Sequence, residues 1–110
     1  MTVVYVVRYD VQPDKWETYL PWSLPAVKKV MAVKGVEKFS GYRVAAGPNQ
    51  IVLNFEFPDF TTFAHWKSNE IVQKMLGDEI FKYTVNLSTE LWGPSPVVPR
   101  PLEPIIPEHG

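Results

Sequence analysis

The sequence predicts an α+β domain with one four-stranded antiparallel sheet, and three observations support this prediction. Short runs rich in β-branched and aromatic residues, which are typical of strands, occupy residues 2–11, 36–46, 51–57 and 84–92. Two longer segments instead repeat apolar residues at helical spacing, at 14–34 and 59–83. A chain of 110 residues has room for one domain with a single modest core. We expect this domain to cover residues 1–92, followed by a proline-rich arm at 93–110.

The first strand is apolar until its end, which predicts that both of its faces are covered. Two prolines interrupt the helical pattern that follows it, Pro21 and Pro25. Because proline removes a helical donor and clashes with the preceding turn, we predict two helical segments in place of one. The first would end near Leu20, and the second would be capped by Ser23 and closed by Gly35.

The middle of the chain predicts a hairpin and a second helix. The strands at 36–46 and 51–57 flank a Gly-Pro-Asn-Gln turn at 47–50. Pro58 stops the second of them, and Asp59, Thr61 or Thr62 can then cap a helix. This helix would run to about Leu76 or, past Gly77, to Tyr83. The alternating run at 84–92 is the last strand, so the order is β-α-β-β-α-β, which is the ferredoxin-like signature.

The arm at 93–110 holds six of the eleven prolines, which predicts extended chain of the polyproline type. A disordered tail is one interpretation. The other is an arm packed over its own subunit or a partner, because several of its residues are too apolar for a purely solvated segment: Val97, Val98, Leu102, Ile105 and Ile106.

The second helix raises a question about Trp66 and His65. At about 100° per residue, its apolar residues form one stripe made of Phe60, Phe63, Ala64, Lys67, Ile71 and Met75. Trp66 then lies roughly 140° from the middle of this stripe, and His65 about 120° away on the other side. We therefore expect Trp66 to border a ligand cavity or a subunit contact. His65 is expected to be a solvated residue or to lie at the rim of that site.

The sheet face that the helices do not cover is predicted to be mixed in chemistry. The last strand divides into Val85, Leu87, Thr89 and Leu91 on one side and Asn86, Ser88, Glu90 and Trp92 on the other. Valines and Trp92 would share this second face with Arg8, Asn54, Glu56, Asn86, Ser88 and Glu90. Such a surface is too apolar for open solvent and too polar for a dry core. It suits a semi-enclosed site for a small hydrophobic or aromatic molecule.

The second-helix pattern F--F-HWKSNEIVQKM resembles the aromatic-x-x-Trp-x-Ser motif of the antibiotic-biosynthesis-monooxygenase-like branch of the dimeric α+β barrel superfamily. The resemblance covers about residues 2–92. It implies a homodimer in which two ferredoxin-like subunits pack sheet to sheet, and it places Trp66 beside the cavity. The haem-degrading relatives carry a histidine about ten residues after this tryptophan, where this chain has Met75, Leu76 and Gly77, so haem is not expected.

The reaction that the resemblance implies is cofactor-independent oxygenation of a phenolic, quinol-like or polyketide-like substrate. Trp66 and Trp92 could form the wall, Asn54 and Asn86 could orient the substrate, Arg8 or Arg43 could stabilise an enolate, and Glu56 or Glu90 could act as the base. Each of these residues also has a structural explanation. A cross-strand pair of Glu56 with Arg8 is favoured over catalysis, and the asparagines could satisfy backbone groups at a dimer contact. A non-catalytic metabolite-binding or assembly dimer and a cofactor-free isomerase or cyclase stay open as alternatives.

The composition argues against several other classes of protein. A net charge of −1 with interspersed signs gives no electrostatic footprint for nucleic acid or an anionic membrane. Without cysteine and with only two histidines, the chain predicts no disulfide framework and no metal site of its own. No apolar run approaches the ~20 residues that span a bilayer, so we expect a cytoplasmic protein.

Overall fold

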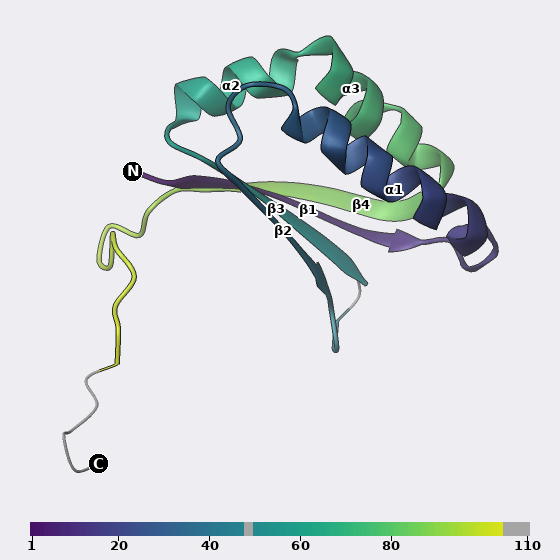
Figure 1. Ribbon diagram of the computed structural model, residues 1–110. Helices are drawn as coiled ribbons and strands as arrows, with labels where there is room; N and C mark the ends of the chain where they lie inside the picture. Colours follow the sequence, from purple (N-terminus) through teal and green to yellow (C-terminus); the bar gives the residue numbers. More distant parts are fainter. Residues whose placement is uncertain (48–49, 105–110) are drawn as a thin grey trace.

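The computed structural model describes residues 1–47 and 50–104, and these form one layer of helices on one four-stranded sheet (Figure 1). The strands are β1 (Val3–Val11), β2 (Lys38–Arg43), β3 (Ile51–Phe57) and β4 (Thr84–Trp92). The helices are α1 (Trp16–Met31), α2 (Phe60–Ser68) and α3 (Glu70–Gly77), with short 3-10 turns η1 (Pro13–Lys15) and η2 (Glu79–Lys82). The sheet order is β2-β3-β1-β4 and every neighbouring pair is antiparallel. The predicted fold class is confirmed.

The first helix is continuous, so the predicted break after Leu20 is wrong. Pro21 and Pro25 both lie inside α1 and are exposed. Ser23 does not cap a new segment, because its hydroxyl donates to the Leu20 carbonyl oxygen at 3.0 Å. Each internal proline costs about 3 kcal/mol of helix stability. Burial of the opposite side of the helix against the sheet offsets this cost, through Tyr19, Trp22, Ala26 and Val30.

The second helix is divided where the sequence predicted one continuous element. Asp59 caps α2 as expected, because its carboxylate accepts the Thr62 backbone N–H at 2.7 Å. Asn69 then adopts an extended conformation, and its side-chain oxygen accepts the Ile71 N–H at 2.8 Å to start α3. A short amide side chain competes with helical hydrogen bonding in this way, which makes asparagine a better cap than an interior residue. The helix axis and the phase of its side chains therefore change at Asn69.

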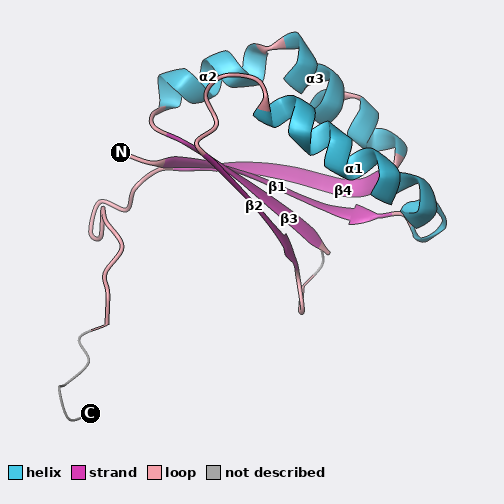
Figure 2. Ribbon diagram, in the orientation of Figure 1, coloured by secondary structure: helices cyan, strands magenta, loops and turns pink. Residues whose placement is uncertain are grey.

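The core lies between the helices and the sheet face that they cover (Figure 2). On β1, alternate residues from Val3 to Val11 point into this layer and are all buried. Phe55 and Phe57 of β3 do the same, and Val72, Met75 and Ile80 close the layer from the helical side.

We call the opposite side of the sheet the open face, because no described helix covers it (Figure 1). The strand register assigns these residues to it: Val4, Val6, Arg8, Asp10, Lys38, Ser40, Tyr42, Val52, Asn54, Glu56, Val85, Ser88, Glu90 and Trp92. The pairing of β1 with β4 shifts between Arg8 and Asp10, and Asn86 in that region has a φ of 57°. This bulge inserts one residue into β4 and moves Val85 to the open face, so the predicted side of Val85 is wrong.

The arm leaves the sheet at the end of β4, close to the N-terminus, and extends away from the helices (Figure 1). Ser95 makes a small turn at its start, because its hydroxyl accepts the backbone N–H groups of Val97 and Val98, each at 3.1 Å. Val97 and Leu102 are 85% and 80% exposed. Whether a partner covers the arm stays a prediction, and its residues 105–110 lie outside the described part of the chain, as do residues 48 and 49 of the hairpin turn.

Candidate functional site

Three of the predicted site residues form a polar network on the open face. The Arg8 Nε–H donates to Glu90 Oε1 at 3.1 Å, and the Trp92 indole N–H donates to Glu90 Oε2 at 2.9 Å. The Arg8 guanidinium also lies 6.0 Å from the centroid of the Trp92 ring, within the range of a cation–π contact. Both carboxylate oxygens of Glu90 are therefore engaged by side chains that the sheet holds in place.

This network replaces the ion pair that the sequence favoured. Arg8 pairs with Glu90 and not with Glu56, because Glu56 lies opposite Val4 in the register, four residues along β1 from Arg8. Four residues of strand span about 13 Å, which is beyond the reach of a direct contact between cross-strand neighbours. Glu90 faces Val6, only two residues from Arg8, which is a diagonal neighbour. The predicted pair of Arg8 with Glu56 is wrong.

The network also fixes the ionisation of Glu90. The hydrogen bond from Trp92, followed by the hydrogen bond and charge of Arg8, lowers the pKa of the Glu90 carboxyl below its ordinary value. A carboxylate held in its ionised form is a weak general base at neutral pH. Of the two predicted bases, Glu56 is therefore the better candidate.

Replacing Trp92 by phenylalanine is expected to raise the pKa of Glu90 towards its ordinary value, because this change removes the largest stabilising hydrogen bond of the carboxylate. The stabilisation is present above the ordinary pKa and is lost as the pH falls through the lowered one. An NMR titration of the side-chain carboxyl carbons would measure the change. Asp59 is the internal control, since its lowered pKa depends on Thr62 and should not move. A Glu90 pKa that is the same in both proteins would contradict the assignment.

The other predicted polar residues divide between the two sides of the sheet. Asn54 and Glu56 lie on the open face of β3, opposite Val6 and Val4. The Asn54 side-chain oxygen is buried and has no hydrogen-bond partner within residues 1–47 and 50–104. Arg43 pairs in register with Ile51, whose side chain packs on the core, so the structure does not bring Arg43 to the open face.

Asn86 is part of the β4 bulge. Its side-chain amide donates to Asp10 Oδ2 at 3.1 Å, and Asp10 Oδ1 accepts the Gln50 backbone N–H at 3.0 Å. Asn86 therefore ties the bulge to the end of β1. This is a structural role of the kind that the sequence left open, although it acts through the Asp10 side chain and not through a backbone group.

Trp66 is fully buried in the core, so its predicted position outside the buried face is wrong. Its exposed fraction is 0%, its indole N–H donates to the Val30 carbonyl oxygen at 2.9 Å, and its ring packs on Phe55 and Phe57 at 5.1 and 5.0 Å between centroids. The helical wheel failed because three members of its stripe, Phe60, Ala64 and Ile71, are exposed, whereas the side of α2 that packs on the core carries Phe63 and Trp66. A side chain with no accessible surface cannot line a subunit contact in this conformation.

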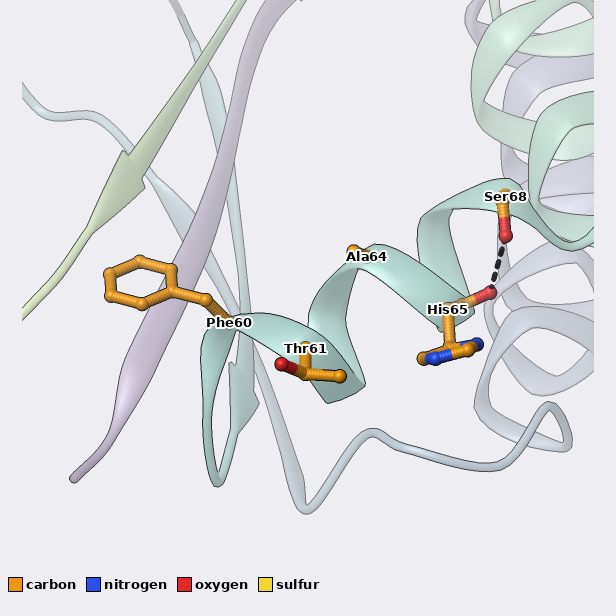
Figure 3. Close-up of a pocket in the computed structure, with 5 residues that line it drawn as sticks. All are labelled: Phe60, Thr61, Ala64, His65 and Ser68. Carbon is orange, nitrogen blue, oxygen red and sulfur yellow. Dashed lines mark hydrogen bonds between the residues drawn. The ribbon is translucent and has the colours of Figure 1, made fainter.

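His65 is exposed, as the sequence predicted. It lies in a shallow depression on the outer side of α2, between Thr61 and Ser68 (Figure 3). The Ser68 hydroxyl donates to the backbone carbonyl of His65 at 2.9 Å, so this bond fixes the helix end and leaves the imidazole unaffected. The depression belongs to the helical layer and is separate from the open face.

A small buried pocket that the sequence did not predict lies under α1. Tyr9 and Tyr19 join their hydroxyl groups at 2.5 Å next to an apolar pocket of about 30 Å³ between α1, the sheet and η2. Burial raises the pKa of both phenols, so both stay protonated. The pocket has room for about one water molecule. The signal was present in the sequence, because Tyr9 lies on the core side of the β1 alternation and Tyr19 on the helical stripe, but their proximity depends on the helix–sheet packing.

Among the described residues, no group of three or more histidine, aspartate or glutamate side chains could hold a metal ion. None of the helices in the same part of the chain has the length and apolar character needed to cross a bilayer.

No protein-family model and no curated protein matches the chain. Solved structures match over most of it. A DABB family protein with a ferredoxin-like fold from Mesorhizobium loti gives a TM-score of 0.76 at 13% identity, over 86% of this chain and 97% of that one. The chain has the ferredoxin-like fold. The predicted resemblance is confirmed at this level.

Two further solved structures match the chain over a similar length. A candidate antibiotic biosynthesis monooxygenase from Nitrosomonas europaea gives a TM-score of 0.67 at 17% identity, over 84% of this chain and 88% of that one. A dimeric ferredoxin-like protein of unknown function from Thermobifida fusca gives 0.69 at 10% identity, over 84% and 90%. At such identities the likeness shows the fold alone.

Proposed function

We propose that the protein is a homodimer whose two open faces pack together and enclose a site for a small hydrophobic or aromatic molecule. The observation that carries this proposal is the exposure of large apolar side chains on a sheet face that no described helix covers. Tyr42, Val85 and Trp92 are 56%, 45% and 42% exposed there. An apolar sheet face of this kind is stable only when another layer buries it. The dimeric protein from Thermobifida fusca supports a second copy as that layer.

The chemistry of the open face supports a ligand site in addition to a subunit contact. Four valines and Trp92 lie among polar groups on this face, and small-molecule sites combine an apolar wall with fixed polar groups in this way. Arg8 is oriented by Glu90 and Trp92. The Asn54 side-chain oxygen is buried without a hydrogen-bond partner among the described residues, at a desolvation cost of about 1–3 kcal/mol. Rotation of the Asn54 amide would present this oxygen to a ligand hydroxyl or N–H.

The proposed reaction is cofactor-independent oxygenation of a phenolic, quinol-like or polyketide-like aromatic substrate. In such a reaction the deprotonated substrate itself reduces oxygen, so the protein supplies an enclosed pocket, a base and a group that stabilises the oxyanion. Glu56 would take the proton, Asn54 would orient the substrate, and Arg8 would stabilise the anion. The structural likeness to the candidate monooxygenase from Nitrosomonas europaea supports this reaction class.

One observation favours a second candidate, a dimer that binds a metabolite without chemistry. Glu90 is ion-paired with Arg8, so these two charges neutralise each other on the open face. This arrangement is well suited to fixing the shape of a binding surface. A cofactor-free isomerase or cyclase would depend on Glu56 as its base, because the pKa of Glu90 is lowered.

Native mass spectrometry of the protein purified from its own host is expected to show a dimer with a co-bound small molecule. Val85→Lys should shift it to monomer, because a charge on the open face opposes burial. Ile71→Lys on α3 is the matched control, since Ile71 is 47% exposed and lies outside the open face. A monomeric wild-type protein, or equal effects of both variants, would refute the proposed dimer. Oxygen uptake with the recovered ligand would support oxygenation, and binding without uptake would support the metabolite binder.

A further inference from the structure

The described part of the arm, residues 93–104, carries exposed apolar side chains on a backbone with few hydrogen-bond donors. Prolines at positions 94, 96, 99, 101 and 104 remove backbone donors at intervals of two or three residues, so the arm cannot pair as a regular strand. Among the residues that the structure describes, Val97 and Leu102 are the most exposed large apolar side chains. Two aliphatic side chains in water on a segment with few polar residues indicate a surface that becomes buried.

The arm is also continuous with the open face. It follows β4, an edge strand of the sheet, and leaves on the side away from the helices (Figure 1). The start of the arm borders a cleft of about 830 Å³ that is lined by Val98 and Arg100 on one side and by Val4 and Glu56 on the other. Val4 and Glu56 belong to the open face, so any layer that covers this face must also meet the arm.

We propose that the arm packs against a second copy of the chain, so that it and the open face form one interface. This inference rests on the proposed homodimer. A second copy on the open face lies next to the cleft, and in a two-fold dimer each arm is presented to the partner in the same way. Val97 and Leu102 supply the apolar contacts. Arg100 and Glu56, which have opposite charges and line the same cleft, complement each other across the interface.

A paramagnetic label tests the contact directly. The chain has no cysteine, so Glu103→Cys gives a single attachment site in the arm and leaves Val97 and Leu102 intact. The tagged variant, prepared without ¹⁵N, is mixed with ¹⁵N-labelled wild-type protein. The control is the same mixture with a diamagnetic tag. Faster relaxation of the Val4 and Glu56 amides of the ¹⁵N-labelled subunits is expected, because those signals report only on the neighbouring subunit. Mixed dimers without this relaxation would overturn the inference.

The contribution of the arm to assembly is tested by Val97→Asp with Leu102→Asp in the full chain. Sedimentation equilibrium is expected to show a dimer dissociation constant raised by at least roughly 100-fold, because burial of four aliphatic side chains is lost in a symmetric dimer. Leu20→Asp with Leu24→Asp is the matched control, since these residues are 60% and 59% exposed on the outer side of α1. An unchanged dissociation constant would overturn the arm contact while the sheet-to-sheet dimer stands. A wild-type chain that is monomeric at all concentrations would overturn both.

Discussion

Trp66→Ala is expected to lower the free energy of unfolding by about 3–5 kcal/mol, which is a large part of the 5–15 kcal/mol that holds a typical domain together. The indole is fully buried and contacts Tyr5, Phe55 and Phe57, so alanine would leave a cavity at the centre of the helix–sheet layer. It would also remove the N–H that the Val30 carbonyl accepts, which joins α2 to the last turn of α1. Urea denaturation followed by circular dichroism would measure the loss.

His65→Ala is the matched control, because His65 precedes Trp66 in the same helix turn and is exposed. Its effect is expected to lie within about 0.5 kcal/mol of zero. Trp66→Phe should fall between the two, since it keeps part of the ring volume and loses the indole donor. If Trp66→Ala were no more destabilising than His65→Ala, the indole would not be a core residue, and the original expectation of a cavity wall would return.

The order of the elements was predictable because each one carries its own local signals. Asp59 caps α2 where expected, and the hairpin forms between β2 and β3 with Arg43 opposite Ile51. The side-chain alternation of β1 and β3 also assigned Arg8, Asn54 and Glu56 to one face correctly. These features depend on residues close together in the chain, and a period of two or a single cap is enough to specify them.

The errors arose where apolar residues are exposed or where a single residue interrupts a regular pattern. The stripe drawn for the second helix included the exposed Phe60, Ala64 and Ile71, so it misplaced Trp66. Asn86 at positive φ inserts a bulge, so the alternation on its N-terminal side reverses and Val85 changes face. The partner of Arg8 depended on the register between β1 and β4, because Arg8 and Glu90 are 82 residues apart in the chain. Local patterns do not specify such a register. Glu56 and Glu90 were equivalent candidates until the register was known.

The two prolines of α1 were a different kind of error, because tertiary packing overrode a correct local preference. Pro21 and Pro25 stand four residues apart on the exposed side of the helix, while Tyr19 and Val30 on the other side are buried. Because proline has no backbone N–H, Pro21 cannot donate a hydrogen bond to the Glu17 carbonyl, and Pro25 cannot donate one to the Pro21 carbonyl. The contacts of the helix with the sheet offset the loss of these two hydrogen bonds.

Pro21→Ala with Pro25→Ala is accordingly expected to raise the free energy of unfolding by about 3–5 kcal/mol. Each alanine regains up to about 3 kcal/mol of helix stability, less about 0.4–1 kcal/mol because the unfolded chain becomes more flexible. Urea denaturation would measure the gain, with Ser23→Ala as a control on the same turn that leaves both prolines in place. No gain in the double variant would mean that α1 has adjusted its backbone around the prolines without loss. A gain of the expected size would show that packing of the buried side alone keeps this helix continuous, which is why no pattern local to 16–31 could have predicted it.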